Sequence, residues 1–254
     1  MAETEESEHL WWAAPRFIMS AAAVVLLVIV GIILFVWMGN DDESEAAPPV
    51  QTQAAPSATS EPADASDESV CGLDATGGTT LTTPPEDVEW EFLGGIAAPK
   101  SAEHGPGVVD EETGVRSCYS HTPEGALLAA TGRLTASGDT ELLLETTKAL
   151  SLEGPGKEIG LERIQRRINS GSTTTPPIKI EGFRLLSYND EEATVEVVAS
   201  ADDGSGFIYY TTSVVMEWHQ GDWYVKYKDD GSGGPVDGQI SDLSGYAPWG
   251  PNSG

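Results

Sequence analysis

Apolar and polar residues alternate along the chain from residue 178 to residue 229, with the period of two that is typical of a half-buried β-strand. Short polar loops at 189–191, 202–205 and 220–221 divide this region into four runs. As hairpin loops, they set residues of one face opposite one another. The predicted pairs are Leu185 with Val195, Phe183 with Val197, Val195 with Thr212, Val197 with Tyr210, Ala199 with Ile208, Val214 with Tyr227, Met216 with Val225, and Trp218 with Trp223. The pattern therefore predicts a four-stranded antiparallel meander.

The first of these strands changes phase part of the way along. Ile178 and Ile180 are out of phase with Phe183. Gly182 lies where the phase changes, and an extra residue at a glycine is typical of a β-bulge. We expect a bulge there that bends the strand and curves the sheet.

The residues before the strands have the spacing of helices. A hydroxyl residue, a proline and an acid at 122–124 form a typical helix start. We expect a helix at about 123–136, a second at about 139–150, and a third, shorter helix that ends at Gly171. These helices are the expected cover for the apolar face of the sheet. The predicted fold class is α+β, with three helices on a curved four-stranded sheet over residues 122–230.

The longest apolar run lies near the N-terminus. Residues 17–40 are 24 consecutive residues without a charge. At about 1.5 Å per residue, a helix of this length spans about 36 Å, which exceeds the ~30 Å hydrocarbon core of a bilayer. We expect an uncleaved signal-anchor, a single-pass transmembrane helix. A secretory signal cleaved near residues 44–46 is the alternative, although the run is longer than a usual signal core of about 7–15 residues.

The basic residues around this run predict its orientation. Arg16 precedes the run, and the next basic residue after it is Lys100. Because Lys and Arg near a span favour the cytoplasmic side, we place residues 1–16 in the cytoplasm. The chain after the span then lies outside the cell membrane and is extracytoplasmic.

Three further segments differ in composition from the helical and strand regions. Residues 41–70 are rich in acids, prolines and small residues and hold no basic residue, which predicts a disordered, self-repelling stalk. Residues 71–121 mix Gly, Pro and Thr with one strand candidate at 88–93, so we expect an irregular lead-in. Residues 231–254 form a tail rich in Gly, Pro and Ser.

The two cysteines lie at the two ends of the lead-in. Cys71 and Cys118 are an even pair in a domain expected outside the cytoplasm, where oxidising conditions favour disulfides. We expect a disulfide that fastens the lead-in to the main domain. Two unrelated buried thiols are the alternative.

The chain is strongly acidic, with 41 Asp and Glu residues against 13 Lys and Arg residues and a formal net charge of -28. Nucleic acid is therefore not an expected partner, because binding phosphates requires a basic face. Two cysteines and four histidines make a zinc site with the usual ligands improbable. We expect neither a metal nor a cofactor.

No catalytic centre is expected. The sequence lacks a nucleophile elbow, a phosphate-cradling Gly-rich loop and a His-Glu-x-x-His helix. His121, with His104 upstream, is the best single catalytic candidate, but no convincing nucleophile or carboxylate partner is spaced near it. His219 at a hairpin bend is expected to face solvent. We therefore expect a protein that is not an enzyme.

Two groups of residues are candidates for binding. The candidate partner contacts are Tyr246, Trp249, Arg163, Arg166 and Arg167. Aromatic anchors dominate many interfaces, but a tail that docks on its own domain is the alternative for the first two, and pairing with nearby acids is the alternative for the arginines. The candidate lining residues of a pocket inside the sheet are Tyr210, Tyr227, Trp218 and Trp223. Membership of the core is the alternative for the buried tyrosines.

Three helices followed by a bent meander, with the final hairpin MEWHQGDWYVKY at 216–227, resemble the nuclear transport factor two-like (cystatin-like) superfamily over about residues 122–229. With an N-terminal anchor and an exported domain, the layout is similar to the membrane-anchored scaffold proteins of type IV secretion and conjugation machines. The stretches PKSAEHGP at 99–106 and CYSHTPEGALLAA at 118–130 are also similar to uncharacterised actinobacterial single-pass membrane proteins.

The resemblance implies a non-catalytic protein whose exported domain mediates protein–protein assembly, in a machine like those of conjugation. Its partners would be other envelope proteins or further copies of the same chain. The alternative is an extracytoplasmic binding module for a small apolar or cell-envelope ligand. An enclosed, elongated pocket would favour the binding module, whereas a solid core with an exposed apolar patch would favour assembly.

Overall fold

The computed structural model describes residues 68–93, 95–171, 178–202, 204, 206–232 and 238–251. These residues belong to one compact unit of the chain, Ser60–Gly254. Within the described ranges, none of the helices has the length and apolar character needed to cross a membrane. The predicted cytoplasmic tail at 1–16, the predicted span at 17–40 and most of the predicted stalk lie outside those ranges.

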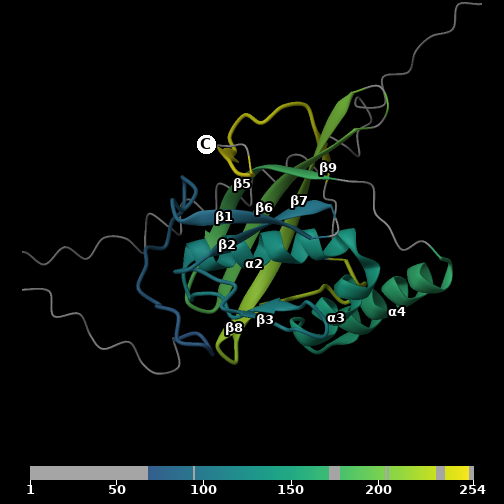
Figure 1. Ribbon diagram of the computed structural model, residues 1–254, viewed down its shortest axis with the longest axis horizontal. Coiled ribbons are helices and arrows are strands. Elements are labelled where there is room, and N and C mark those ends of the chain that lie inside the picture. Colours follow the sequence, from purple (N-terminus) through teal and green to yellow (C-terminus); the bar gives the residue numbers. More distant parts are fainter. Residues whose placement is uncertain are drawn as a thin grey trace, which may run out of the picture. The chain divides into compact units, whose positions relative to one another are not determined.

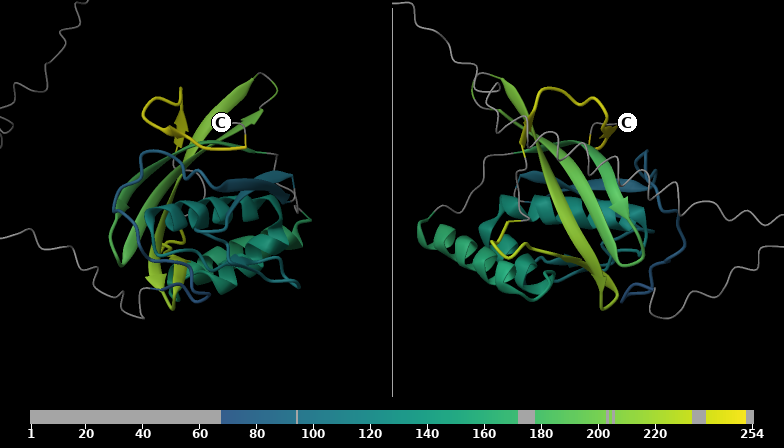
Figure 2. Two further views of the ribbon diagram at one scale, coloured as in Figure 1. Left: turned by 60° about the vertical axis from the view of Figure 1, so that its left-hand side comes forward. Right: turned by 180° about the vertical axis from the view of Figure 1, so that it is seen from behind.

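The described chain begins with four strands, continues with the helices and ends with six strands. The helices are α2 (Pro123–Thr135), α3 (Thr140–Ala149) and α4 (Pro155–Asn169), with a 3-10 turn η2 (Ala136–Gly138). The strands are β1 (Val88–Leu93), β2 (Ile96–Ser101), β3 (Val108–Val109), β4 (Arg116–Ser117), β5 (Lys179–Tyr188), β6 (Glu192–Asp202), β7 (Phe207–His219), β8 (Asp222–Val225), β9 (Gly238–Ile240) and β10 (Ala247–Pro248). The fold is α+β, and the helices lie on one side of the main sheet (Figure 2).

The main sheet has six strands, so the prediction of a four-stranded sheet is wrong. Four strands form the expected meander, and the order along the sheet is β10-β5-β6-β7-β8. The short strand β9 pairs with β7, beyond the stretch that β8 occupies. Both extra strands come from the Gly-rich tail, whose composition does not favour strands. They form because the edges of β5 and β7 present unpaired backbone groups that the tail can pair with.

The outer hairpins of the meander have the predicted register. The structure contains the predicted pairs Phe183 with Val197, Leu185 with Val195, Met216 with Val225, and Trp218 with Trp223. The predicted bulge is confirmed, because the register of β5 shifts between Ile180 and Gly182. A second irregularity lies between Leu185 and Ser187.

The middle hairpin differs from the prediction by two residues. Val195 lies opposite Val214 instead of Thr212, and the other pairs of this hairpin shift with it. A shift of two leaves every side chain on its predicted face, so the apolar face stays continuous. Tyr227 follows the end of β8, so its predicted pairing with Val214 is not formed.

Helix α2 is the centre of the fold and begins as the sequence predicts. The Thr122 side chain accepts a hydrogen bond from the backbone N–H of Gly125, and Pro123 occupies the first turn. Most of the helix is buried, because it contacts the sheet through β5, β6 and β7 and contacts β2 as well (Figure 1). Because the sheet and β2 both pack against α2, the helix carries many small residues, which let these neighbours approach closely.

The lead-in at 71–121 is more regular than we expected. It contains two antiparallel hairpins, β1–β2 and β3–β4. The strand predicted at 88–93 is confirmed as β1, but its partner β2 was missed because Pro99 and Lys100 are poor strand residues. Strand β2 is nevertheless largely buried, since it packs along α2.

The third helix is longer than predicted. Helix α4 spans 15 residues from Pro155, where we expected a helix shorter than the other two. The prediction followed only the apolar residues from Leu161 onward. The first turns carry Gly156 and Gly160 instead, which give the Tyr227 side chain room against the helix.

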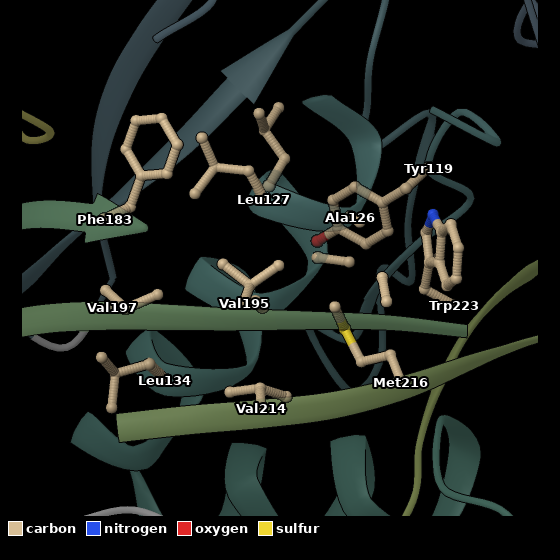
Figure 3. Packing of buried hydrophobic residues seen from close by; sticks show 14 of the residues in the cluster. Tyr119, Ala126, Leu127, Leu134, Phe183, Val195, Val197, Val214, Met216 and Trp223 are labelled. Carbon is tan, nitrogen blue, oxygen red and sulfur yellow. The ribbon is translucent and has the colours of Figure 1, made fainter. Parts of the chain in front are cut away.

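The hydrophobic core lies between α2 and the apolar face of the sheet. Val195, Val197, Val214 and Met216 extend from the strands toward Leu127 of α2 (Figure 3). Trp223 and Phe183 close the two ends of this layer and are almost fully buried. The alternating residues of the meander therefore form the core that their pattern predicts.

Candidate functional site

A broad, open groove of about 620 Å³ lies at the edge of the sheet where β8 ends the strand order. Its walls come from the β3–β4 hairpin, the last turn of α3, the β7–β8 turn and the segment around residue 70. The lining residues are Val70, Val108, Asp110, Thr113, Val115, Ser117, Glu145, Lys148, Ala149, Leu150, Gln220, Asp222 and Tyr224. We call this feature the edge groove.

A disulfide joins the two ends of the lead-in beside the edge groove. Cys71 and Cys118 are bonded, with their Cα atoms 6.1 Å apart. Beside this bond, the backbone N–H of Val70 donates to the carbonyl of Gly221 at 2.8 Å. Gly221 has a φ of 80° and lies against the Val70 backbone, so a side chain there would be strained and would clash. The predicted disulfide is therefore present and fixes Val70 at the rim of the groove.

Asp222 anchors the floor of the edge groove. Its side chain is 3% exposed and accepts backbone N–H groups from Cys118, from Tyr119 at 3.0 Å and from Trp223 at 2.8 Å. Burial raises the pKa of the Asp222 carboxyl, while the three backbone donors oppose that shift. Through these contacts one carboxylate joins the first residues of β8 to the disulfide.

The segment after α3 forms a second wall of the groove, and backbone hydrogen bonds attach it to β8. The N–H of Val225 donates to the carbonyl of Leu150 at 2.9 Å, and the N–H of Leu152 donates to the carbonyl of Val225 at 3.0 Å. The segment after α3 therefore covers part of the open edge of β8.

The rim of the edge groove combines exposed valines with acidic groups. The lining residues Val70 and Val108 are 69% and 43% exposed, which is unusual for β-branched apolar residues that line one surface. Among the lining residues Lys148 carries the positive charge, and it already pairs with Glu145 at 2.7 Å. The surface is therefore apolar and net negative.

His121 lies in a separate polar pocket of about 160 Å³ that Tyr188 and Asp190 also line. Its ring stacks on Trp218 with the centroids 4.0 Å apart. The Nε2 atom lies 2.8 Å from the backbone carbonyl of Asp190, and because a carbonyl only accepts, Nε2 must carry the proton. The Tyr188 hydroxyl donates to the carbonyl of His121, and burial raises the pKa of this tyrosine. These contacts hold the imidazole in place as a structural donor.

The four candidate pocket-lining residues do not meet around one cavity. A small cavity of about 20 Å³ lies beneath the sheet, and Trp223 borders it. Trp218 stacks on His121, and the Tyr227 hydroxyl accepts a hydrogen bond from Arg133. Tyr210 lies half-buried on β7. These aromatic side chains therefore pack on or in the core, which is the alternative given for the two tyrosines.

The two aromatic residues of the tail dock on their own domain. Trp249 is 2% exposed, and its indole N–H donates to the Thr131 hydroxyl at 3.0 Å. Its ring meets that of Trp90 edge-on at 4.9 Å. Tyr246 lies under the guanidinium of Arg184, 4.8 Å from it. Trp249 is thus part of the core and is not available to a partner.

The candidate arginines lie along α4. Arg163 donates to the carbonyls of Gly231 at 2.8 Å and Asp230 at 2.9 Å, which ties the helix to the segment after β8. The side chain of Arg166 contacts the carbonyl of Glu162 within its own helix. Arg167 follows on the same helix. No shared ligand site is formed by these three among the described residues.

Asp87, Glu103 and His104 form a group that could hold a divalent cation. Each residue offers one ligand atom, and these atoms all lie within 4.8 Å of one another. The His104 Nδ1 atom also lies 3.2 Å from the Ser120 hydroxyl. The sequence contains no ligand spacing that would reveal this group. Asp87 reaches the other two only because β1 pairs with β2.

The fold and the edge groove define an acidic, disulfide-linked α+β domain with an open apolar surface. The chain belongs to the family described as a domain of unknown function (DUF8175), whose family model matches residues 51–248. Comparison with curated proteins and with solved structures found no match. The family match covers the disulfide, the edge groove and both strands of the tail.

Proposed function

We propose that this domain is an exported, non-catalytic protein-binding module that docks a partner in the edge groove. The proposal rests on the location of the open space in the domain, which is at the edge of the sheet and not beneath it. The cavity beneath the sheet has about 20 Å³, whereas the edge groove has about 620 Å³ and exposed valines on its rim. Surface apolar patches rimmed by polar groups are typical of protein interaction sites.

The disulfide supports the extracytoplasmic location. Cys71 and Cys118 are the two cysteines of the chain, and both are used in the bond. Disulfides persist in oxidising compartments and are rare in the cytosol. The bond also lies next to the edge groove, so the oxidising conditions outside the cytoplasm would stabilise the rim of the binding surface.

The partner's chemistry follows from the charge of the groove. Asp110 and Glu145 line it, and the exposed residues Glu111 and Glu112 extend the negative charge along the β3–β4 turn. A segment that carries basic side chains beside small apolar ones would complement this surface. We propose an envelope protein with such a segment, in an assembly like the conjugation machines to which the layout is similar.

Site-specific photo-cross-linking in the native host tests this proposal. A photoreactive residue at position 70 of the full-length chain should give one dominant cross-linked protein, because Val70 lines the groove and is 69% exposed. The control places the same residue at position 186, because Leu186 is also an exposed apolar residue, at 47%, but lies on β5, away from the groove.

A substitution then links the cross-link to the groove itself. Val108→Lys should reduce the cross-link from position 70 about tenfold or more, because it replaces an apolar side chain of the groove with a charge that repels a basic partner segment. Leu186→Lys should leave it unchanged. The same product from both cross-linker positions, or a product that Val108→Lys leaves at full strength, would refute the docking surface.

A further inference from the structure

The small cavity beneath the sheet is lined by two arginines, by the hydroxyl residues Tyr119 and Thr146, and otherwise mainly by apolar residues. Its volume is about 20 Å³, enough for one water molecule or one single-atom ion. The apolar lining residues include Leu93, Leu142, Leu150, Met216 and Val225. Arg116 and Arg133 also border the cavity, one from β4 and one from the last turn of α2.

Arg116 is buried and keeps one donor without an acceptor. The residue is 6% exposed, and its terminal nitrogens donate to the Glu91 carboxylate and, at 3.1 Å, to the Pro99 carbonyl. Its Nε atom is buried and has no hydrogen-bond partner among the described residues. Leaving a buried, charged donor unpaired is costly, so an acceptor is expected at this position.

Arg133 has the same unsatisfied atom and no counter-charge. Its Nη2 atom donates to the hydroxyls of Thr147, at 3.1 Å, and Tyr227. In the part of the chain that the structure describes, no carboxylate lies within ion-pair distance of it. Its Nε atom is likewise buried without a partner. With 41 acidic residues in the chain, the absence of an acid here does not reflect a shortage.

The charges around the cavity are therefore unbalanced. Glu91 compensates Arg116, whereas only neutral hydroxyls face Arg133. Both arginines remain charged at any physiological pH. A water molecule would supply an acceptor but would leave the positive charge of the partly buried Arg133 without a counter-charge. A monovalent anion would supply acceptors to both Nε–H groups and balance the charge.

We propose that this cavity is a binding site for one small monovalent anion, of which chloride is the simplest, held by the Nε–H groups of Arg116 and Arg133. The ion joins β4 to α2 and so connects the disulfide-linked lead-in to the centre of the core. The site is separate from the edge groove, and its test does not depend on whether a partner docks there.

Thermal unfolding of the full-length chain tests the site. The comparison is between sodium chloride and sodium gluconate at equal ionic strength, because gluconate is too large for a cavity of this volume. Chloride at about ten times its dissociation constant should raise Tm by about 3–6 °C over gluconate, with saturation. Chloride-35 NMR line broadening by the protein gives a direct readout of binding.

Two variants of Arg133 and one control assign the ion to the cavity. Arg133→Met should abolish the saturable Tm shift and the broadening, whereas Arg163→Met should keep both, because Arg163 donates to backbone carbonyls on α4's outer side. Should Arg133→Met fail to fold, Arg133→Lys keeps the charge but lacks Nε–H, and should bind chloride about tenfold more weakly.

Three results would overturn the proposal. The first is an equal Tm in chloride and gluconate for the native chain. The second is the absence of chloride broadening. The third is broadening that neither Arg133 variant changes, which would show an adventitious ion only.

Discussion

At the scale of single residues, Asp222 contributes most to the order of the edge groove. Its one carboxylate accepts three backbone N–H groups, two of them from residues more than 100 positions earlier in the chain. From the sequence, Asp222 looks like an ordinary aspartate after a tight turn, since nothing local indicates Cys118 and Tyr119 as partners. This role was missed because the partners meet only after the lead-in has folded back on the sheet.

Replacing this carboxylate with an amide should destabilise the domain. In Asp222→Asn, one acceptor oxygen becomes an NH₂ group that faces backbone donors. We expect a loss of about 1–3 kcal/mol in the free energy of unfolding, measured by urea titration of the full-length chain. Glu111→Gln, an exposed acid on the β3–β4 turn, is the control and should change stability by less than about 0.5 kcal/mol. A variant as stable as the native chain would show that water satisfies these donors.

At the scale of elements, local patterns predicted the parts of the fold that depend on local physics. The cap at Thr122, the strand at 88–93 and the bulge at Gly182 all follow from residues within a few positions. Strands β2, β9 and β10 were not predictable in this way. They have poor strand composition, and each forms because a partner strand presented a free edge.

The tail strand β10 brings Trp249 into the core. The indole packs between Trp90 and Phe183, with ring centroids 4.9 and 5.9 Å away. The sequence shows that Trp249 is aromatic, but it does not show whether the side chain contacts a partner or its own domain. That depends on a gap between α2, β1 and β5, which only the fold reveals. An aromatic residue in a flexible-looking tail is therefore weak evidence for an external contact.

Truncation of this side chain should have a large effect. Trp249→Ala removes a fully buried indole and leaves the Thr131 hydroxyl without its donor. We expect a loss of about 3–5 kcal/mol in the free energy of unfolding. Phe207→Ala is the matched control, because Phe207 is 69% exposed at the end of β7 and should contribute little. Similar losses for both variants in chemical denaturation would mean that the tail does not dock as described.

At the scale of the whole molecule, stability and the proposed binding surface both involve the disulfide. The sequence predicted the bond from compartment and cysteine number, but it could not predict the edge groove. The groove exists because Val70, the β3–β4 hairpin and β8 converge there, and these segments lie up to about 150 residues apart in the sequence. The acidic composition was visible at once, whereas the apolar rim emerged only from the fold.

Loss of the disulfide should therefore weaken the domain and loosen the rim of the edge groove. The bond joins residues 47 positions apart, for which loop-closure entropy corresponds to about 4 kcal/mol. A Cys71→Ser, Cys118→Ser double variant should lose about this much stability in urea unfolding. Dithiothreitol should lower the stability of the native chain to the same level and leave the double variant unchanged, because the variant has no bond to reduce. If the double variant instead matched the oxidised native chain, the hydrogen bonds of Val70 and Asp222 alone would be holding the lead-in, and the disulfide would not contribute to the geometry of the groove.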